Sequence, residues 1–208
     1  MKRIGLFGGT FDPIHNGHIR IAVEVAENLQ LDEVRLIPLN QPSHRSRPIA
    51  SAAQRLEMIS SAIKVPLVLD DIEIQRGGTS FTVDTLNYLK AEYPSCSLLM
   101  ILGDDAFWSL KTWHKAEDIF KLTNIVVVSR DCDVKERQES PHVSLGGVLS
   151  THVTDLIDSI GRVYFLKTPL LHISSTEIRR KVRLNKSISG LVPTAVEKII
   201  LGNNLYTS

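Results

Sequence analysis

The chain has 208 residues, 43% of them hydrophobic and 23% charged, which is the composition of a folded globular protein and excludes a disordered one. Its 24 Lys and Arg nearly balance 23 Asp and Glu, and this near-neutrality argues against a protein built to hold a nucleic-acid backbone. Two cysteines, Cys96 and Cys132, are too few for a disulfide framework and lack metal-ligand spacing. No apolar run reaches the roughly 20 residues of a membrane span, and the first residues have the pattern of a strand. We therefore expect one cytoplasmic domain over residues 1–208, with no membrane partner.

Apolar runs and helical periodicity alternate along the first two thirds of the chain. Strands are predicted at Arg3–Phe7, Val34–Ile37, Leu67–Ile74, Leu98–Leu102 and Ile125–Val128. Helices are predicted between them, over Ala22–Leu29, over Leu56–Ile63 with a cap at Ser51, over Val83–Leu89 with a cap at Thr79 or Ser80, and over Trp113–Phe120. Continuously apolar strands separated by helices predict a doubly wound α/β fold, in which a mostly parallel sheet has helices on both faces.

The last third is less regular. Residues 131–150 are polar and form a candidate mobile connection. A further strand is predicted at Arg162–Leu166, and a helix through Ile178 and Val182. A terminal helix is predicted to begin near Pro193 and to end just before Gly202. Ligands of parallel sheets bind beyond the carboxyl ends of the strands, so the loops after Phe7, Ile37, Leu102 and Val128 matter most.

The densest group of chemistry-bearing residues lies between the first strand and the first helix, in Gly8-Gly9-Thr10-Phe11-Asp12-Pro13-Ile14-His15-Asn16-Gly17-His18. The glycine pair allows main chain to approach a bulky anion closely. Gly17-His18 opens a helix whose free N–H groups and positive dipole end favour phosphate. Two imidazoles three residues apart can reach the same phosphate chain, so this string predicts a phosphate site.

Known phosphate and metal motifs do not match this string. A Walker loop needs a lysine that is absent here, and the spacing of Gly5, Gly8 and Gly9 differs from the dinucleotide fingerprint. A zinc site at His15 and His18 lacks a third ligand nearby, and a plain glycine turn does not account for the whole string. Adjacent carboxylates such as Asp104 and Asp105 rarely converge on one ion. No resident metal is expected.

A second group lies far downstream, in Ile173-Ser174-Ser175-Thr176-Glu177-Ile178-Arg179. Ser174 or Ser175 followed by Glu177 is close to a capping box, which is a purely structural explanation. The same geometry also directs hydroxyls and free N–H groups towards the carboxyl edge of the sheet. The basic run from Arg179 to Arg183 is interpreted as a solvated helix face and not as an RNA-binding surface.

The strings GGTFDPIHNGH and ISSTEIR together resemble the T/HxGH nucleotidyltransferase superfamily. Three further segments narrow the resemblance to bacterial nicotinate-nucleotide adenylyltransferases: Pro42-Ser43-His44-Arg45, TSFTVDTL at residues 79–86, and Gly103-Asp104-Asp105 with Trp113-His114-Lys115. The similarity covers essentially the whole chain in the expected order. One departure is Ser43, where many relatives have a second proline. The resemblance implies a Rossmann-like sheet, with the helices of residues 174–202 completing an ATP site.

The reaction that this resemblance implies is transfer of AMP from ATP to nicotinate mononucleotide, which gives nicotinate adenine dinucleotide, the precursor of NAD, and pyrophosphate. The phosphate of the mononucleotide is already ionised at neutral pH, so neither a general base nor a covalent intermediate is needed. Catalysis then consists of positioning and of stabilising charge, with Mg²⁺ carried on the triphosphate. The expected partners are these small molecules and no nucleic acid.

The resemblance also implies a role for each residue of the site. The catalytic set would be His15, His18 and Arg45. ATP would be bound by Gly9, Thr10, Phe11, Gly103, Asp105, Ile173, Ser174, Ser175, Thr176 and Arg179. The phosphates between the two nucleotides would be faced by His44, Arg45 and Arg130. The nicotinate carboxylate would be received by Thr82 and the backbone of His114, and Trp113 would stack on the nicotinate ring. Taken alone, Trp113 is more typical of a core residue and Arg130 of a solvated strand end.

Two alternatives have specific tests. A sister adenylyltransferase, such as the pantetheine-phosphate enzyme, shares both end motifs, but it is shorter and lacks counterparts of the TSFTVDTL and Trp113 segments. A nucleotide-binding regulator without turnover would be indicated by loss of His18 or Arg45, and both are present. The sequence does not indicate an oligomeric state.

Overall fold

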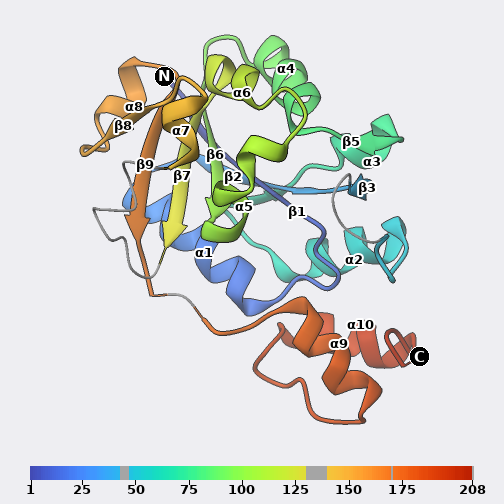
Figure 1. The fold of residues 1–208 in the computed structure, drawn as a ribbon. Coiled ribbons are helices and arrows are strands. Elements are labelled where there is room, and N and C mark those ends of the chain that lie inside the picture. The colour runs from blue at the N-terminus through green and yellow to red at the C-terminus, as the bar shows by residue number, and fades with distance from the viewer. Residues whose placement is uncertain (43–46, 130–139, 170, 208) are drawn as a thin grey trace.

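The computed structural model describes residues 1–42, 47–129, 140–169 and 171–207. Its centre is a seven-stranded sheet with the order β4-β2-β1-β6-β7-β9-β8, in which each neighbouring pair is parallel (Figure 1). The strands are β1 (Arg3–Gly9), β2 (Glu33–Pro38), β4 (Leu67–Leu69), β6 (Ser97–Gly103), β7 (Asn124–Ser129), β8 (Val148–Ser150) and β9 (Arg162–Lys167). A separate two-stranded sheet pairs β3 (Gln41–Pro42) with β5 (Thr79–Ser80). The predicted parallel α/β fold is confirmed.

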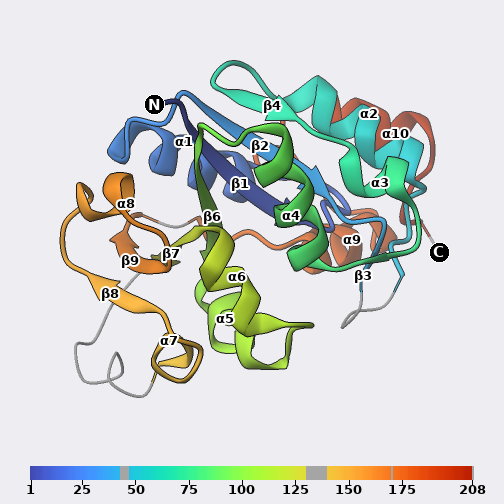
Figure 2. The ribbon, with the colours of Figure 1, turned by 90° about the horizontal axis from the view of Figure 1, so that it is seen from above.

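Helices cover both faces of the large sheet (Figures 1 and 2). One face packs against α1 (Asn16–Asn28), α2 (Ala52–Ala62) and α10 (Thr194–Gly202), and the other against α4 (Thr82–Glu92), α5 (Asp104–Trp108) and α6 (Ala116–Leu122). Strand β6 shows the division, because Leu99 and Ile101 belong to the first core whereas Leu98, Met100 and Leu102 belong to the second. Successive side chains of a strand point to opposite faces, so a continuously apolar strand serves both cores.

The order of strands reverses between β1 and β6. From β1 the chain winds outward through β2 to β4, and it then returns through α4 to β6, on the other side of β1. Such a switch point leaves a crevice at the carboxyl ends of the two strands, and ligands of open α/β sheets bind there. The loop after Gly9 and the loop after Gly103 leave the sheet at this crevice.

Short elements complete the chain: α3 (Ile72–Arg76), the 3₁₀ helix η1 (Leu110–Thr112), α7 (Pro141–Ser144), α8 (Asp155–Asp158) and α9 (Ser175–Arg183). The predicted connection 131–150 is thus partly structured, since α7 and β8 lie within residues 140–150, while residues 131–139 fall outside the described ranges. In the part of the chain that the structure describes, no helix is long and apolar enough to span a membrane.

Four expectations about boundaries were wrong. The strand predicted at Leu67–Ile74 ends at Leu69, because the Asp70 carboxylate accepts the N–H of Ile72 at 3.2 Å and starts α3 instead. Thr79 and Ser80 do not cap α4; they form β5, and the Ser80 hydroxyl accepts the N–H of Asn40 at 2.9 Å.

The other two corrections concern helix ends. Trp113 is not part of α6, because Lys115 adopts a left-handed φ of +50° and separates it from the helix. Gly202 is the last residue of α10, and the cap is Asn203. The helix cap predicted at Ser51 is confirmed, since its hydroxyl accepts the N–H of Gln54.

Candidate active site

The loop from β1 to α1 begins with main chain in close contact with an aromatic ring. A side chain at Gly9 would place its Cβ 2.9 Å from the ring of Phe11, so only glycine fits. Phe11 has a left-handed φ of +48° and is 1% exposed, and its ring meets the rings of Phe7 and His18 edge-on. The Phe11 ring therefore packs against the imidazole of His18 and helps to fix its position. Phe11 is also predicted to border the nucleotide cleft.

Two histidines begin α1 and cap it reciprocally. His15 Nδ1 accepts the N–H of His18, and His18 Nδ1 accepts the N–H of His15, each at 3.3 Å. The rings are stacked with centroids 3.6 Å apart. A side chain at Gly17 would place its Cβ 3.0 Å from His15 Nδ1, so the intervening glycine makes room for this stack. Because each Nδ1 accepts a hydrogen bond, the proton of each neutral ring lies on Nε2.

Both imidazoles are held in the neutral form. Burial lowers the pKa of His15 to about 4. Burial, and then the proximity of His15, place the pKa of His18 well below its usual 6.5. His15 is 5% exposed. At neutral pH the pair therefore presents two uncharged Nε2–H donors and no cations, and an anion bound to them would raise both pKa values.

Helix α9 is joined to this loop by two long-range hydrogen bonds. The Ser175 hydroxyl donates to the carbonyl of Pro13 at 2.9 Å, and Arg179 Nη1 donates to the carbonyl of Asp12 at 2.7 Å. Ser174 caps the helix by accepting the N–H of Glu177, which confirms the helix cap predicted at Ser174 or Ser175. The two long-range hydrogen bonds bring the start of α9 next to the start of α1, at the carboxyl ends of the strands.

Unpaired main-chain donors lie at both helix starts. Within the described residues, the N–H groups of Gly17, Ser175 and Thr176 donate to no acceptor. The hydroxyl proton of Ser175 is occupied by Pro13, so this residue offers a ligand its N–H group. Ile173 lies beside Gly17, with its Cβ 3.6 Å from where a Cβ of Gly17 would stand. Donors of this kind, together with the two histidines, are suited to bind a polyanion.

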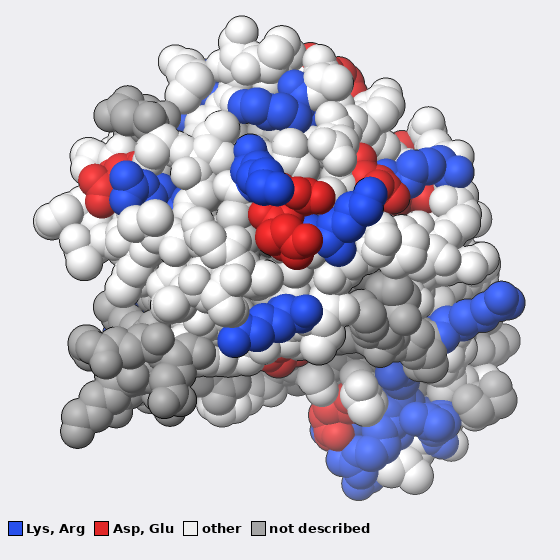
Figure 3. Space-filling model, turned by 45° about the horizontal axis from the view of Figure 1, so that its top comes forward, with Lys and Arg blue, Asp and Glu red and all other residues white. Residues whose placement is uncertain are grey.

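Of the basic residues at the far end of α9, Arg180 and Arg183 are exposed and Lys181 is half-buried. Arg180, Lys181 and Arg183 lie in its last turn, and Arg180 pairs with Glu177 at 2.8 Å. Figure 3 shows blue side chains gathered at the lower end of the molecule, where α9 lies. A largely exposed and partly paired group agrees with a solvated helix face.

The end of β6 supplies the other wall of the crevice. Gly103 caps α5, and a Cβ there would lie 3.2 Å from Asp105 Oδ1, so this carboxylate folds back against the turn. Gly103 is paired in register with Val128 of β7, and Asp105 is exposed. The contact of Gly103 and Asp105 with adenosine stays a prediction.

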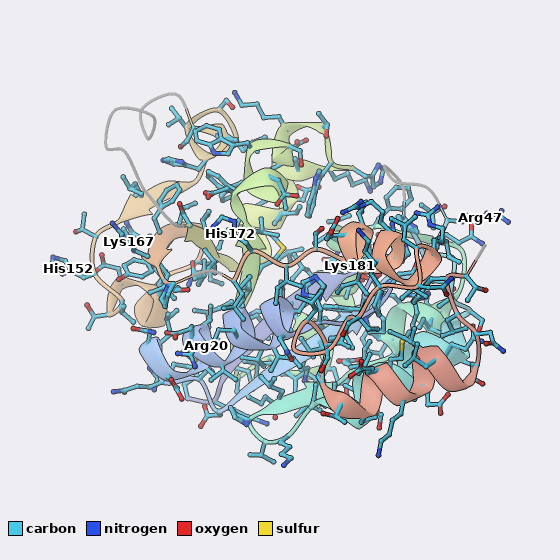
Figure 4. The ribbon with its side chains drawn as sticks, turned by 90° about the horizontal axis from the view of Figure 1, so that it is seen from below. Arg20, Arg47, His152, Lys167, His172 and Lys181 are labelled. Atoms are coloured by element: carbon cyan, nitrogen blue, oxygen red, sulfur yellow. The ribbon has the colours of Figure 1, made fainter. Side chains whose placement is uncertain are left out.

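A cavity of about 530 Å³ lies next to the small sheet. Its lining residues are Gln41, Pro42, Arg47, Thr79, Phe81, Thr112 and His114. The rings of Phe81 and His114 face one another across a centroid distance of 4.5 Å. Arg47 is exposed and lies on the opposite side of the molecule from Lys167 and His152 (Figure 4). The cavity thus combines two aromatic surfaces with an arginine at its edge.

The predicted acceptor residues have different positions relative to this cavity. Thr82 is the first residue of α4, and His114 lines the cavity; among the described residues, neither N–H has an acceptor. Trp113 is not one of the lining residues: it is half-buried against the second core, and its indole N–H donates to Ser109 at 3.3 Å. His44, Arg45 and Arg130 lie outside the described residues.

No metal centre is formed in the described ranges, where no three His, Cys, Asp or Glu side chains lie close enough to hold an ion. The carboxylate pair at residues 104–105 belongs to no such group. A divalent cation that arrives with a triphosphate is held by the phosphate oxygens and is part of that substrate.

Comparison with known proteins identifies the family of the chain. The cytidylyltransferase-like family model matches residues 6–181. Probable nicotinate-nucleotide adenylyltransferases of Pseudomonas fluorescens and Methylococcus capsulatus are 42% and 40% identical to the chain, over 99% and 98% of it and over 97% and 99% of their own lengths. The chain belongs to the nicotinate-nucleotide adenylyltransferase family.

Solved structures share the fold of this adenylyltransferase. A Plasmodium falciparum nicotinic acid mononucleotide adenylyltransferase complexed with NaAD matches with a TM-score of 0.77 at 19% identity, over 99% of this chain and 98% of that one. A putative nicotinate-nucleotide adenylyltransferase from Vibrio parahaemolyticus matches with a TM-score of 0.68 at 20% identity, over 100% and 97%.

Several residues of the candidate site of this adenylyltransferase were not predicted from the sequence. Phe81 and Arg47 line the cavity, and Arg55, 1% exposed, donates from Nη1 to the carbonyls of Thr10 and Leu39 at 2.9 and 2.7 Å. The guanidinium of Arg55 thus ties together the loops after β1 and β2. Its position on α2 matched no motif, and an arginine within a helix is usually solvated, so the sequence carried no signal for it.

Proposed function

We propose that the enzyme transfers AMP from ATP to nicotinate mononucleotide, with release of pyrophosphate and formation of nicotinate adenine dinucleotide. The observation that carries the proposal is the joining of the starts of α1 and α9 at the switch point of the sheet, with free N–H groups and two neutral imidazoles there. This arrangement supplies hydrogen-bond donors to a triphosphate from two directions.

The ATP side of the proposal uses the β1–α1 loop, α9 and the end of β6. His15 and His18 donate from Nε2 to phosphate oxygens, and the N–H groups of Ser175 and Thr176 donate from the facing helix. Arg179, anchored through Nη1 on Asp12, retains further N–H donors for the same phosphates. Gly9, Thr10 and Phe11 border the nucleotide, Gly103 and Asp105 receive the ribose, and Ile173 and Ser174 flank the adenine.

The acceptor side of the proposal uses the cavity. The pyridine ring packs against Phe81 and His114, and its carboxylate accepts the unpaired N–H groups of Thr82 and His114. His44, Arg45 and Arg130 are proposed to meet the acceptor phosphate, whose oxygen attacks the α-phosphorus of ATP as the bond to pyrophosphate breaks. The attacking phosphate is ionised, so no side chain has to remove a proton. Mg²⁺ on the triphosphate neutralises charge as pyrophosphate leaves.

The rate enhancement then comes from positioning and from donors aimed at developing charge. A donor that contacts the transferring phosphate more closely in the transition state than in bound ATP raises kcat and leaves KM nearly unchanged. Such a donor contributes on the order of 10²–10³ in kcat. Arg55 holds the loop after β1 against the loop after β2, and these loops carry the two substrate sites.

The decisive test is pyrophosphate release from ATP with a panel of acceptors: nicotinate mononucleotide, its amide analogue, and pantetheine phosphate. We expect turnover with nicotinate mononucleotide and its adenylylated product by mass spectrometry. Turnover only with pantetheine phosphate would identify the sister enzyme. ATP binding without pyrophosphate release from any acceptor would indicate a regulator.

A further inference from the structure

Tyr206 occupies a buried position that its main chain reaches through an unfavourable conformation. Tyr206 has a φ of +63°, in the left-handed region that residues other than glycine, asparagine and aspartate rarely adopt; Asn204 also lies in this region, with a φ of +50°. The Tyr206 side chain is nevertheless 3% exposed, and its hydroxyl donates to Asp12 Oδ1 at 2.7 Å. A conformation of this kind persists only where surrounding contacts fix it, and function is a common reason.

The Asp12 carboxylate collects three hydrogen bonds in a buried place. Oδ2 accepts the N–H of Ile49 at 2.7 Å, and Oδ1 accepts both the N–H of Ala50 at 3.0 Å and the Tyr206 hydroxyl. Asp12 is 4% exposed, and the buried guanidinium of Arg55 interacts with it electrostatically. A buried carboxylate needs such donors, because without them its desolvation is costly.

Asp12 is the point at which the parts of the site meet. Its carbonyl holds Arg179 of α9, and it lies three residues before His15. The N–H groups that its carboxylate holds, at residues 49 and 50, follow the segment that contains His44 and Arg45 by a few residues. Asp12 therefore connects three parts of the proposed site. It belongs to the β1–α1 loop, its carbonyl holds α9, and its carboxylate holds the main chain of Ile49 and Ala50.

We propose that Tyr206 is a positioning residue for adenylyl transfer. Its hydroxyl fixes the Asp12 carboxylate, and this carboxylate in turn holds the β1–α1 loop and the Ile49–Ala50 segment in place relative to each other. The hydroxyl remains a donor throughout the working pH range, because burial and the neighbouring Asp12 raise the pKa of Tyr206. The proposal rests on the proposed function, since it assigns Tyr206 to the same reaction. Small errors of placement in such a site cost rate more than binding.

The test variant is Tyr206→Phe, which keeps the ring and removes only the hydroxyl. We expect kcat with ATP and nicotinate mononucleotide to fall about tenfold, with both KM values within about threefold of wild type. The matched control is Val196→Ala in α10, a residue that is 0% exposed and packs in the first core without contacting Asp12 through a hydrogen bond. It should lower Tm at least as much as Y206F while keeping kcat within about twofold.

A second readout is independent of the substrates. Hydrogen exchange at the Ile49 and Ala50 amides should be at least about tenfold faster in Y206F than in wild type, and unchanged relative to neighbouring amides in V196A. Wild-type kcat in Y206F, or an equal loss of kcat in V196A, would overturn the positioning role. If the wild-type enzyme does not turn over nicotinate mononucleotide, the proposed function fails by itself. The exchange data then still decide whether Tyr206 orders this segment.

Discussion

The imidazole rings of His15 and His18 lie face to face, with centroids 3.6 Å apart and planes inclined by 18°. Each ring uses Nδ1 to cap the same helix turn, so each has only Nε2–H left for a ligand. Two positive charges at this separation would repel strongly, and burial also disfavours them. The pair therefore acts through neutral hydrogen-bond donors that are fixed before substrate binds.

His18→Ala is expected to lower kcat by on the order of 10²–10³, with little change in the KM for ATP, because the lost donor serves the transition state. Gln at this position places an amide N–H near the location of Nε2, so His18→Gln should retain more activity. Steady-state kinetics of both variants provide the measurement. A kcat of H18A within about threefold of wild type would remove His18 from the mechanism.

Stability should fall as the pH is lowered from about 6.5 to about 4. In this interval His15 is protonated in the unfolded chain but stays neutral in the folded protein, whose His15 pKa lies near 4. The unfolded state then binds the additional proton, so the free energy of unfolding decreases with falling pH, by about 3 kcal/mol for this residue. Below pH 4 the contribution levels off, because the folded state is protonated as well.

The matched variant for that measurement is His15→Asn, since asparagine is a good helix cap but does not titrate. Urea unfolding at pH values between 7 and 4 should give a shallower loss of stability in H15N than in wild type. His18, whose pKa is also lowered, would account for part of the slope that remains. Parallel curves for the two proteins would show that folding does not lower the pKa of His15.

Arg45 is predicted to act on the acceptor phosphate through charge and through the planar fork of its guanidinium. Arg45→Lys keeps the charge and loses the fork, so it should retain partial activity, whereas Arg45→Ala should lose most of it. The comparison needs kcat/KM for nicotinate mononucleotide in both variants. Equal activities would count against a phosphate contact.

The enzyme should prefer the acid mononucleotide over the amide by roughly 10²-fold or more in kcat/KM. The unpaired N–H groups of Thr82 and His114 suit the two acceptor oxygens of a carboxylate, whereas a carboxamide would bring its own N–H donors against them. The two substrates differ only in this group, so the ratio measures it directly. Comparable kcat/KM values would show that no carboxylate pocket exists.

Phe81→Ala should raise the KM for nicotinate mononucleotide about tenfold and leave that for ATP within about twofold, because the Phe81 ring lines the cavity next to His114. Tyr88→Ala is a suitable control. Tyr88 lies on α4, the helix that follows Phe81 directly, but it is 56% exposed and does not line the cavity. Trp113→Ala should raise the KM for nicotinate mononucleotide less than Phe81→Ala does, because Trp113 does not line the cavity. A larger effect of W113A would assign the stacking role to Trp113.

The sequence predicted the elements whose signal is local and long. The strands β1, β2, β6 and β7 are mostly apolar, and α1, α2 and α4 bury apolar residues at helical spacing. The short helices α3 and α5 were missed, because five residues are too few to show a period. Thr79 and Ser80 have good capping side chains, but pairing with β3 and the hydrogen bond from Asn40 determine their structure instead.

The site was predicted in the same uneven way. Local sequence patterns indicate phosphate binding at the glycine loop, at both histidines and at the start of α9. No local pattern predicts the hydrogen bonds that join these segments. Ser175 bonds to Pro13 across 162 positions of sequence, and Tyr206 bonds to Asp12 across 194. Nothing near Tyr206 in the sequence marks it, because its role exists only after the fold has brought Asp12 to it.

The large sheet ends on both sides in a strand of three residues, β4 and β8, while its longer strands are all internal. An edge strand presents unpaired N–H and C=O groups on which another chain can add a strand. Here each edge offers a template of only three residues, and the residue before β4, Pro66, has no N–H to contribute. The architecture that places the active site at the middle of the sheet thereby also protects the enzyme from edge-to-edge aggregation.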